Sequence, residues 1–252
     1  MTTMQEAPSV AKAQNSRGIR NVVLVHGAWG DGSNWSKVIP LLEAKGLHVV
    51  AVQNPLTSLA DDVASTLRAI ALQDGPVLLV GHSYGGAVIT EAGNDPKVTG
   101  LVYVAAFTPD AGEAAGDLGK AFPMPPGLGE LRPDAFGFLS LTPKGISEDF
   151  AQDLSAAEKQ MLVATQHPTS GAALGGKVTT AAWKSKPSWY VVAKNDRMIS
   201  PQFEESMAKQ IKAKSITTVT SSHLAMLAKP VEIADFIADA ALNIAPSPST
   251  IQ

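Results

Sequence analysis

The 252-residue chain contains no cysteine, so it has no disulfide framework and no thiolate that could act as a nucleophile or metal ligand. Its longest apolar runs, such as 101–107, are far shorter than the roughly 18 residues that a membrane-spanning helix needs. Basic residues are not in excess, because 20 Lys and Arg are set against 23 Asp and Glu. This balance lacks the basic footprint of a nucleic-acid-binding protein. We expect neither nucleic acid nor a membrane as a partner.

Residues 1–20 contain no continuous apolar stretch of the kind that a secretory signal requires, roughly 7–15 residues. We interpret 1–20 as a flexible N-terminal tail and 245–252 as a C-terminal tail, and we expect a cytoplasmic protein. The amphipathic last helix is compatible with a monomer or a homodimer.

Apolar runs alternate with segments of helical periodicity along most of the chain. The expected strands are 21–25, 47–52, 77–80, 101–106, 188–193 and 215–219. The expected helices are 34–45, 58–71, 85–92, 148–165, 201–213 and a last one with Pro230 near its first turn. Strands that are apolar throughout are typical of a parallel sheet covered on both faces, so the pattern predicts an α/β fold.

The alternation is interrupted between residues 108 and 183, where prolines and glycines cluster around 123–129. This predicts a core built from 21–107 and 184–244, with 108–183 as an insertion.

The segment Gly81-His-Ser83-Tyr-Gly85 matches the pattern G-x-S-x-G directly after an apolar run and before a helix. This placement is typical of a nucleophile elbow, which exposes the serine hydroxyl at the end of a strand. Side chains at positions 81 and 85 would collide with the neighbouring strand and helix. A glycine-rich turn with an incidental serine, or a phosphate loop, is the alternative, but neither common phosphate-binding motif is present. We predict Ser83 as the nucleophile.

A serine nucleophile needs a base and an orienting acid, which follow it in the order acid, then histidine, in this fold class. His223 lies just after the last expected strand, and His167 in the insertion is the alternative base. Asp196 lies in the loop after strand 188–193, and Asp110 is the alternative acid. We predict Asp196 and His223.

The first strand ends in His26-Gly-Ala28-Trp. In this fold class the loop at that point and the residue after the nucleophile each supply a main-chain N–H to the oxyanion, which predicts Ala28 and Tyr84. We interpret His26 and His82 as structural. The scattered histidines lack metal-ligand spacing, and we expect no metal and no cofactor.

These motifs, together with Asn195-Asp-Arg197 and Ser222-His223, resemble the α/β-hydrolase superfamily over 21–241. Segment 221–226 resembles the branch of plant methylesterases and hydroxynitrile lyases and its bacterial relatives. The resemblance implies the α/β-hydrolase fold, with a mostly parallel central sheet, helices on both faces and the insertion as a small cap over the substrate pocket. Lyases of that branch carry a lysine directly after the catalytic histidine, where this chain has Leu224, which favours ester hydrolysis.

We therefore expect a serine esterase that cleaves small to medium apolar carboxylic esters through an acyl-enzyme intermediate. Apolar side chains are expected to form its substrate pocket, although they could instead simply pack the cap onto the sheet: Trp29, Phe107, Phe122, Phe136, Phe138, Trp183 and Leu224. The alternatives are a non-hydrolytic enzyme of the same fold, such as a perhydrolase or a lyase, and a receptor-like protein that binds its ligand with little turnover.

Overall fold

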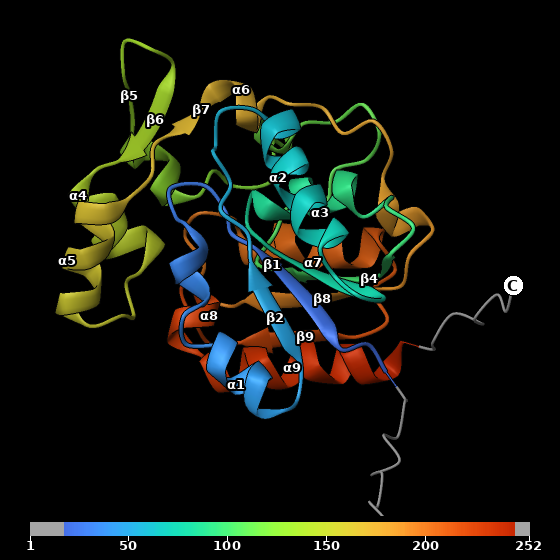
Figure 1. The fold of residues 1–252 in the computed structure, drawn as a ribbon. Coiled ribbons are helices and arrows are strands. Elements are labelled where there is room, and N and C mark those ends of the chain that lie inside the picture. The colour runs from blue at the N-terminus through green and yellow to red at the C-terminus, as the bar shows by residue number, and fades with distance from the viewer. Residues whose placement is uncertain (1–17, 245–252) are drawn as a thin grey trace, which may run out of the picture.

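The computed structural model describes residues 18–244, so the predicted C-terminal tail and most of the N-terminal tail lie outside the described residues. Six strands form a central sheet in the order β2-β1-β3-β4-β8-β9, and every neighbouring pair is parallel (Figure 1). These strands are β1 (Asn21–Val25), β2 (His48–Ala51), β3 (Val77–His82), β4 (Val98–Val104), β8 (Ser188–Ala193) and β9 (Ile216–Val219). The predicted parallel α/β architecture is confirmed.

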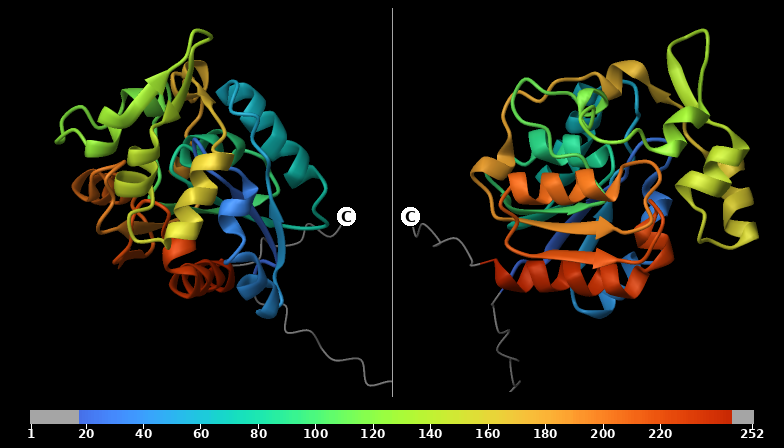
Figure 2. Two further views of the ribbon diagram at one scale, coloured as in Figure 1. Left: turned by 90° about the vertical axis from the view of Figure 1, so that its left-hand side faces the viewer. Right: turned by 180° about the vertical axis from the view of Figure 1, so that it is seen from behind.

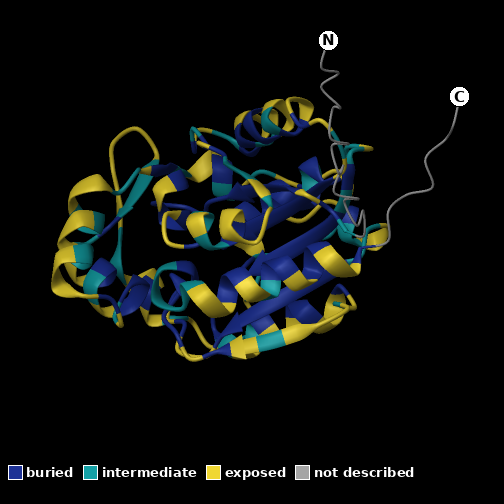
Figure 3. Cartoon of the chain, turned by 60° about the horizontal axis from the view of Figure 1, so that its bottom comes forward, coloured by how far each residue is buried: buried dark blue, intermediate teal, exposed yellow. Residues whose placement is uncertain are grey.

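Helices cover both faces of this sheet (Figures 1 and 2). One face carries α2 (Leu59–Ala71), α3 (Gly85–Ala92) and α7 (Pro201–Gln210). The other carries α1 (Ile39–Ala44) and α9 (Pro230–Asn243), with the short α8 (Ala225–Ala228) before it. Because the sheet is enclosed in this way, every residue of β1, β3 and β8 is buried (Figure 3). Within the described residues, no helix is long and apolar enough to cross a membrane.

The chain between β4 and β8 leaves the sheet, and we call residues 108–183 the cap. It contains a three-stranded antiparallel sheet in the order β5-β6-β7. Its elements are β5 (Leu131–Pro133), β6 (Phe138–Leu141), α4 (Pro143–Gly145), α5 (Ala156–Thr165), β7 (Thr169–Ser170) and α6 (Gly171–Leu174). Part of the cap, including β5, β6, α4 and α5, projects beyond the end of the central sheet (Figure 1).

The prediction of one helix over 148–165 is wrong. The chain forms a π-helical turn at Ile146–Phe150, leaves the helical path, and begins α5 at Ala156. The second start is encoded locally: Ser155 Oγ accepts a hydrogen bond from the N–H of Glu158, and the Glu158 carboxylate accepts one from the N–H of Ser155. This capping box fixes a new N-terminus inside the expected helix.

The expected helix over 34–45 is also divided. A 3-10 turn, capped by the carboxylate of Asp31, spans Gly32–Trp35, and α1 begins only at Ile39. Pro40 lies in the first turn of α1, where its missing N–H breaks no helical hydrogen bond, so it favours a helix start at this point.

Candidate active site

Ser83 directly follows β3, and its backbone adopts the left-handed conformation with φ +52°. This conformation is uncommon for a residue with a side chain, so it has to be held by its surroundings. The N–H of Ser83 is shared between the carbonyls of Val104 and Ala105, at 3.3 and 3.2 Å, and its carbonyl accepts the N–H of Gly86 at 2.9 Å. The turn thus holds the Ser83 side chain at the carboxyl end of the sheet.

The two glycines of the motif make this turn possible. A Cβ atom at Gly81 would lie 2.6 Å from the carbonyl oxygen of Gly85, and one at Gly85 would lie 2.6 Å from that of Val25. Both contacts are with backbone, which cannot rotate away. The prediction that these positions exclude side chains is confirmed.

His223 and Asp196 form a buried pair. Nδ1 of His223 lies 2.5 Å from Oδ2 of Asp196, and both side chains are inaccessible to solvent. The other carboxylate oxygen, Oδ1, accepts the N–H groups of Met198 and Ile199 at 2.7 and 2.9 Å. An ionised carboxylate only accepts, so the imidazole proton belongs on Nδ1. Nε2 of His223 then carries a lone pair, and it has no hydrogen-bond partner among residues 18–244.

His82 brings this pair next to the serine turn. Its ring centroid lies 4.6 Å from that of His223, and its Nε2 donates to the carbonyl of His223 at 3.0 Å. Burial, and secondarily the neighbouring His223, lower the pKa of His82 well below its ordinary value. His82 is therefore neutral and links the residue before Ser83 to the loop of His223.

The two alternatives lie elsewhere. Asp110 forms an ion pair with Lys184 at 2.5 Å, and His167 is half-buried and donates its main-chain N–H to the carbonyl of Trp29. Neither hydrogen-bonds to Asp196 or His223. The structure therefore pairs the acid and histidine that the sequence favoured.

Ala28 and Tyr84 both border the same cavity as Ser83. Within the described residues, neither of their main-chain N–H groups donates a hydrogen bond. The loop passes close to the serine, since a Cβ atom at Gly27 would lie 2.7 Å from Cβ of Ser83. Two unpaired main-chain donors beside one hydroxyl are what an oxyanion requires.

The buried ring of His26 stabilises this loop through two hydrogen bonds. Its Nδ1 donates to the carbonyl of Gly27 at 2.8 Å, and its Nε2 accepts the N–H of Asn54 at 2.9 Å. Burial lowers the pKa of His26 to about 4, so the ring is neutral, as this pattern of one donor and one acceptor requires.

Trp29 also attaches this loop to the cap, a contact that the sequence analysis missed. Trp29, at φ +60°, donates its main-chain N–H to Oγ1 of Thr169 and its indole N–H to the carbonyl of Leu139, both at 3.0 Å. A displacement of the cap would therefore also displace Trp29 and the adjoining residue Ala28.

A second contact that the sequence analysis missed holds Tyr84. Its hydroxyl donates to Oδ2 of Asp62 at 2.7 Å, while Oδ1 of Asp62 accepts the N–H of Leu56 at 2.8 Å. Asp62 is fully buried, which raises its pKa, on a helix face that it shares with Thr66 and Ile70. Asp62 is four residues before Thr66 and eight before Ile70, and this helical spacing could have indicated from the sequence that Asp62 lies on the buried face.

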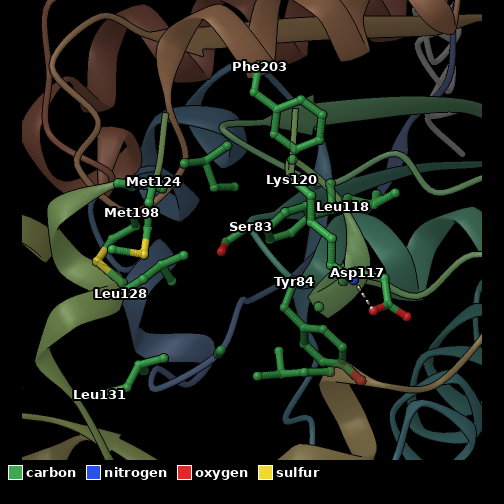
Figure 4. A pocket seen from close by; sticks show the side chains of 18 of the residues that line it. Ser83, Tyr84, Asp117, Leu118, Lys120, Met124, Leu128, Leu131, Met198 and Phe203 are labelled. Carbon is green, nitrogen blue, oxygen red and sulfur yellow. Dashed lines mark hydrogen bonds and ion pairs between the residues drawn. The ribbon is translucent and has the colours of Figure 1, made fainter. Parts of the chain in front are cut away.

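Ser83 opens into a cavity of about 680 Å³ between the core and the cap (Figure 4). Apolar side chains form much of its wall: Met124, Leu128, Leu131, Leu139, Met198 and Phe203. Its charged side chains, Lys120 and Asp117, form an ion pair at 2.9 Å. The cavity therefore presents an apolar wall with little net charge.

Three of the predicted pocket residues, Trp29, Phe107 and Phe122, border this cavity. The other four do not, and the prediction for them is wrong: Phe136, Phe138, Trp183 and Leu224.

Each of the four has a different environment. Phe136 is 87% exposed at the turn between β5 and β6. Phe138 precedes Leu139 in a strand, so the two side chains point to opposite faces and Leu139 borders the cavity. Trp183 donates its indole N–H to the carbonyl of Pro109, and Leu224 is packed in the core.

Within residues 18–244, no group of three or more His, Asp or Glu side chains could hold a metal ion. Ser83 and the residues of the two free main-chain donors border the cavity, and His223, with its unpaired Nε2, is packed against His82, the residue before Ser83.

The fold and this site define the chain as an α/β hydrolase. The sequence model of the alpha/beta hydrolase family matches residues 22–236, and the chain belongs to that family.

Relatives place it near the expected branch. The chain is 26% identical to an alpha-hydroxynitrile lyase of Arabidopsis thaliana, over 84% of this chain and 93% of the lyase. It is 25% identical to a pyrethroid hydrolase of Sphingobium wenxiniae, over 88% and 87% of the two chains. The crystal structure of polyneuridine aldehyde esterase shares the fold, with a TM-score of 0.76 at 21% identity over 88% of this chain and 99% of the esterase.

Proposed function

We propose that this α/β hydrolase is a serine esterase that cleaves small to medium, uncharged apolar carboxylic esters. The observation that carries the proposal is that Ser83, at φ +52°, borders the cavity directly after His82, whose ring contacts that of His223 in the buried Asp196–His223 pair, where Nε2 is unpaired. Relatives named as a pyrethroid hydrolase and as a methylesterase support ester hydrolysis as the chemistry.

In the first half-reaction, Oγ of Ser83 attacks the ester carbonyl carbon as Nε2 of His223 takes the hydroxyl proton. Asp196 keeps Nδ1 protonated and stabilises the imidazolium that forms. The carbonyl oxygen becomes an oxyanion between the N–H groups of Ala28 and Tyr84. Collapse of the tetrahedral intermediate breaks the bond to the alcohol oxygen, which receives the proton from His223.

In the second half-reaction, water loses a proton to His223 and attacks the acyl-enzyme carbonyl. The bond to Ser83 breaks, Oγ recovers the proton, and the carboxylic acid leaves. Each turnover therefore consumes one ester and one water and releases one alcohol and one acid.

Two features favour an uncharged substrate. The side chains around Ser83 are largely apolar, and the charges of Lys120 and Asp117 are paired with each other (Figure 4). Cyanohydrin cleavage is the competing chemistry because one relative is an alpha-hydroxynitrile lyase. Leu224 argues against cyanohydrin cleavage. It is apolar and fully buried, and it occupies the position directly after His223, where the lyases of the branch that this chain resembles carry a lysine.

The test is release of p-nitrophenol from the acetate and butyrate esters by the wild type and by Ser83→Ala. We expect the variant to lose turnover by several orders of magnitude, and a serine-directed organophosphate to label Ser83 in the wild type alone. A wild type that turns over neither ester and remains unlabelled would overturn the proposal. Cyanohydrin cleavage or ligand binding would then be assayed.

A further inference from the structure

A second carboxyl group lies in the interior beside Asp196. Glu204, on α7, is completely buried. The N–H of Ala193 donates to its Oε2 at 2.9 Å, while Oε1 has no hydrogen-bond donor among the described residues. Within residues 18–244, no lysine or arginine forms an ion pair with it. An ionised Glu204 would therefore be a buried charge with one partner, which is energetically unfavourable.

The groups that face Glu204 make ionisation less favourable still. Glu204 is held at the turn of Asp196, because Ala193, which donates its N–H to Glu204, accepts the N–H of Asp196 at 3.1 Å. Burial, followed by the charge of Asp196, raises the pKa of Glu204 well above its ordinary value. Tyr190 of β8 and the exposed Glu205 are its other titratable neighbours. All three neighbours are acidic, so none stabilises a second negative charge.

Two adjacent carboxyl groups that are both buried share one negative charge, and the donors decide which group carries it. Asp196 receives hydrogen bonds from the N–H groups of Met198 and Ile199 and from Nδ1 of His223. Glu204 receives one, from Ala193. The charge therefore belongs on Asp196 and the proton on Glu204.

We propose that Glu204 is a positioning residue that, as a neutral acid, donates a hydrogen bond from Oε1 to the carboxylate of Asp196. The inference rests on the proposed function, in which Asp196 orients His223 as the base. The added donor fixes the Asp196 carboxylate from a fourth direction and spreads its negative charge. Glu204, Asp196 and His223 then form a continuous hydrogen-bonded series that ends at the free Nε2.

The pH dependence of kcat/KM for p-nitrophenyl butyrate tests this with three variants. In Glu204→Gln, the amide keeps both contacts, and a neutral group replaces a neutral group. We expect its acid limb to coincide with that of the wild type. Glu205→Gln, an exposed change of the same kind on the next residue, is the control and should also coincide.

Glu204→Met removes the donor while keeping an unbranched side chain of similar length. The carboxylate of Asp196 then holds the His223 proton more tightly, and we expect the acid limb to move to higher pH by about half a unit. We also expect kcat to fall by about tenfold, because His223 is less well oriented.

An acid limb that moves to lower pH in Glu204→Gln would show that Glu204 is charged in the wild type. A Glu204→Met profile that coincides with the wild type would show that it does not act on the pair. Either result overturns the proposal.

An infrared measurement gives an answer that does not depend on turnover or on the methionine variant folding. The difference spectrum of wild type minus Glu204→Gln at neutral pH should contain the carbonyl band of a buried protonated carboxyl group. A band of an ionised carboxylate in its place would overturn the inference. Retention of turnover by Ser83→Ala would instead overturn the proposed function, so the two failures are distinguishable.

Discussion

Oδ2 of Asp153, in the cap, accepts the main-chain N–H of Ser222 at 2.7 Å, one residue before His223. The cap also touches His223 itself, because the ring of Phe150 lies 5.4 Å from the imidazole. Ser222 is completely buried, so its N–H has no access to water in place of this carboxylate. The cap therefore supports the predicted base from outside the core.

The same segment holds the loop of the predicted acid. Nε2 of Gln152 donates to the carbonyl of Asn195, and Nε of Arg197 pairs with Oδ1 of Asp149, both at 2.6 Å. These contacts flank Asp196 on both sides. Residues 149–153 thus connect the cap to both loops from which the Asp196–His223 pair comes.

Removing the Asp153 carboxylate should impair catalysis without changing the cavity wall. We expect Asp153→Ala to lower kcat by about tenfold, equivalent to about 1.4 kcal/mol, because the N–H of Ser222 loses its acceptor and the His223 loop shifts. Asp153→Asn keeps an acceptor oxygen and should lose less. KM should change little, as Asp153 does not border the cavity. Steady-state kinetics check this, with Asp134→Ala as control, because Asp134 caps an exposed turn of the same cap. Equal kcat values for the two alanine variants would contradict the prediction.

The Tyr84 hydroxyl should matter for stability more than for turnover. In Tyr84→Phe, Oδ2 of buried Asp62 loses its donor, and we expect the free energy of unfolding to fall by about 1–3 kcal/mol. The main-chain N–H of Tyr84 is unchanged, so kcat should fall by less than about tenfold.

Urea unfolding of this variant is best compared with Tyr103→Phe. Tyr103 is equally buried, but its hydroxyl contacts the neutral Thr90, whose Oγ1 retains a bond to the carbonyl of Gly86. The second variant should therefore lose less stability. Equal losses, or complete inactivation by Tyr84→Phe alone, would contradict the interpretation.

Features set by short stretches of sequence could be predicted. The strands of the core are apolar throughout because both faces are covered, and that pattern needs no knowledge of distant residues. The turn at Ser83 was predictable for a similar reason, since Gly81 and Gly85 mark where backbone approaches backbone.

Contacts between distant segments could not be predicted in this way. Asp62 contacts Tyr84, 22 residues away, and Asp153 contacts Ser222, 69 residues away. The helical spacing around Asp62 indicates that it lies on a buried face, but neither segment identifies the distant partner of its carboxylate. The prediction of which residues border the cavity was partly wrong for a more local reason. In a strand of the cap, one position decides whether Phe138 or Leu139 faces the cavity, and composition alone cannot decide it.

The corrected cavity wall predicts which phenylalanine controls substrate size. Phe203 borders the cavity and packs against Phe122, with ring centroids 5.0 Å apart, whereas Phe136 is exposed outside it. We expect Phe203→Ala to raise KM for p-nitrophenyl butyrate by roughly threefold to tenfold, because apolar contact with the acyl chain is lost. The acetate, which is shorter, should be affected less. Phe136→Ala should leave both KM values unchanged, and a shift in that variant equal to the one in Phe203→Ala would refute the assignment.

His26 should make the protein sensitive to acid. Its pKa is lowered from 6.5 to about 4 in the folded state, so between these values the unfolded chain binds a proton that the folded chain does not. The free energy of unfolding therefore rises with pH across this window and falls, by up to about 3 kcal/mol for this one group, as the pH drops from 6.5 to 4. His26→Gln can still accept the N–H of Asn54 but does not titrate, so its stability should be lower at pH 7 and less dependent on pH below it.

Urea unfolding at a series of pH values measures how the free energy of unfolding of the wild type and of each variant depends on pH. His48→Gln alters an exposed histidine and should keep the wild-type slope, and the contribution of His82 is common to all three proteins. If the free energy of unfolding depended on pH equally in His26→Gln and His48→Gln, His26 would not be the group whose protonation destabilises the folded protein in acid.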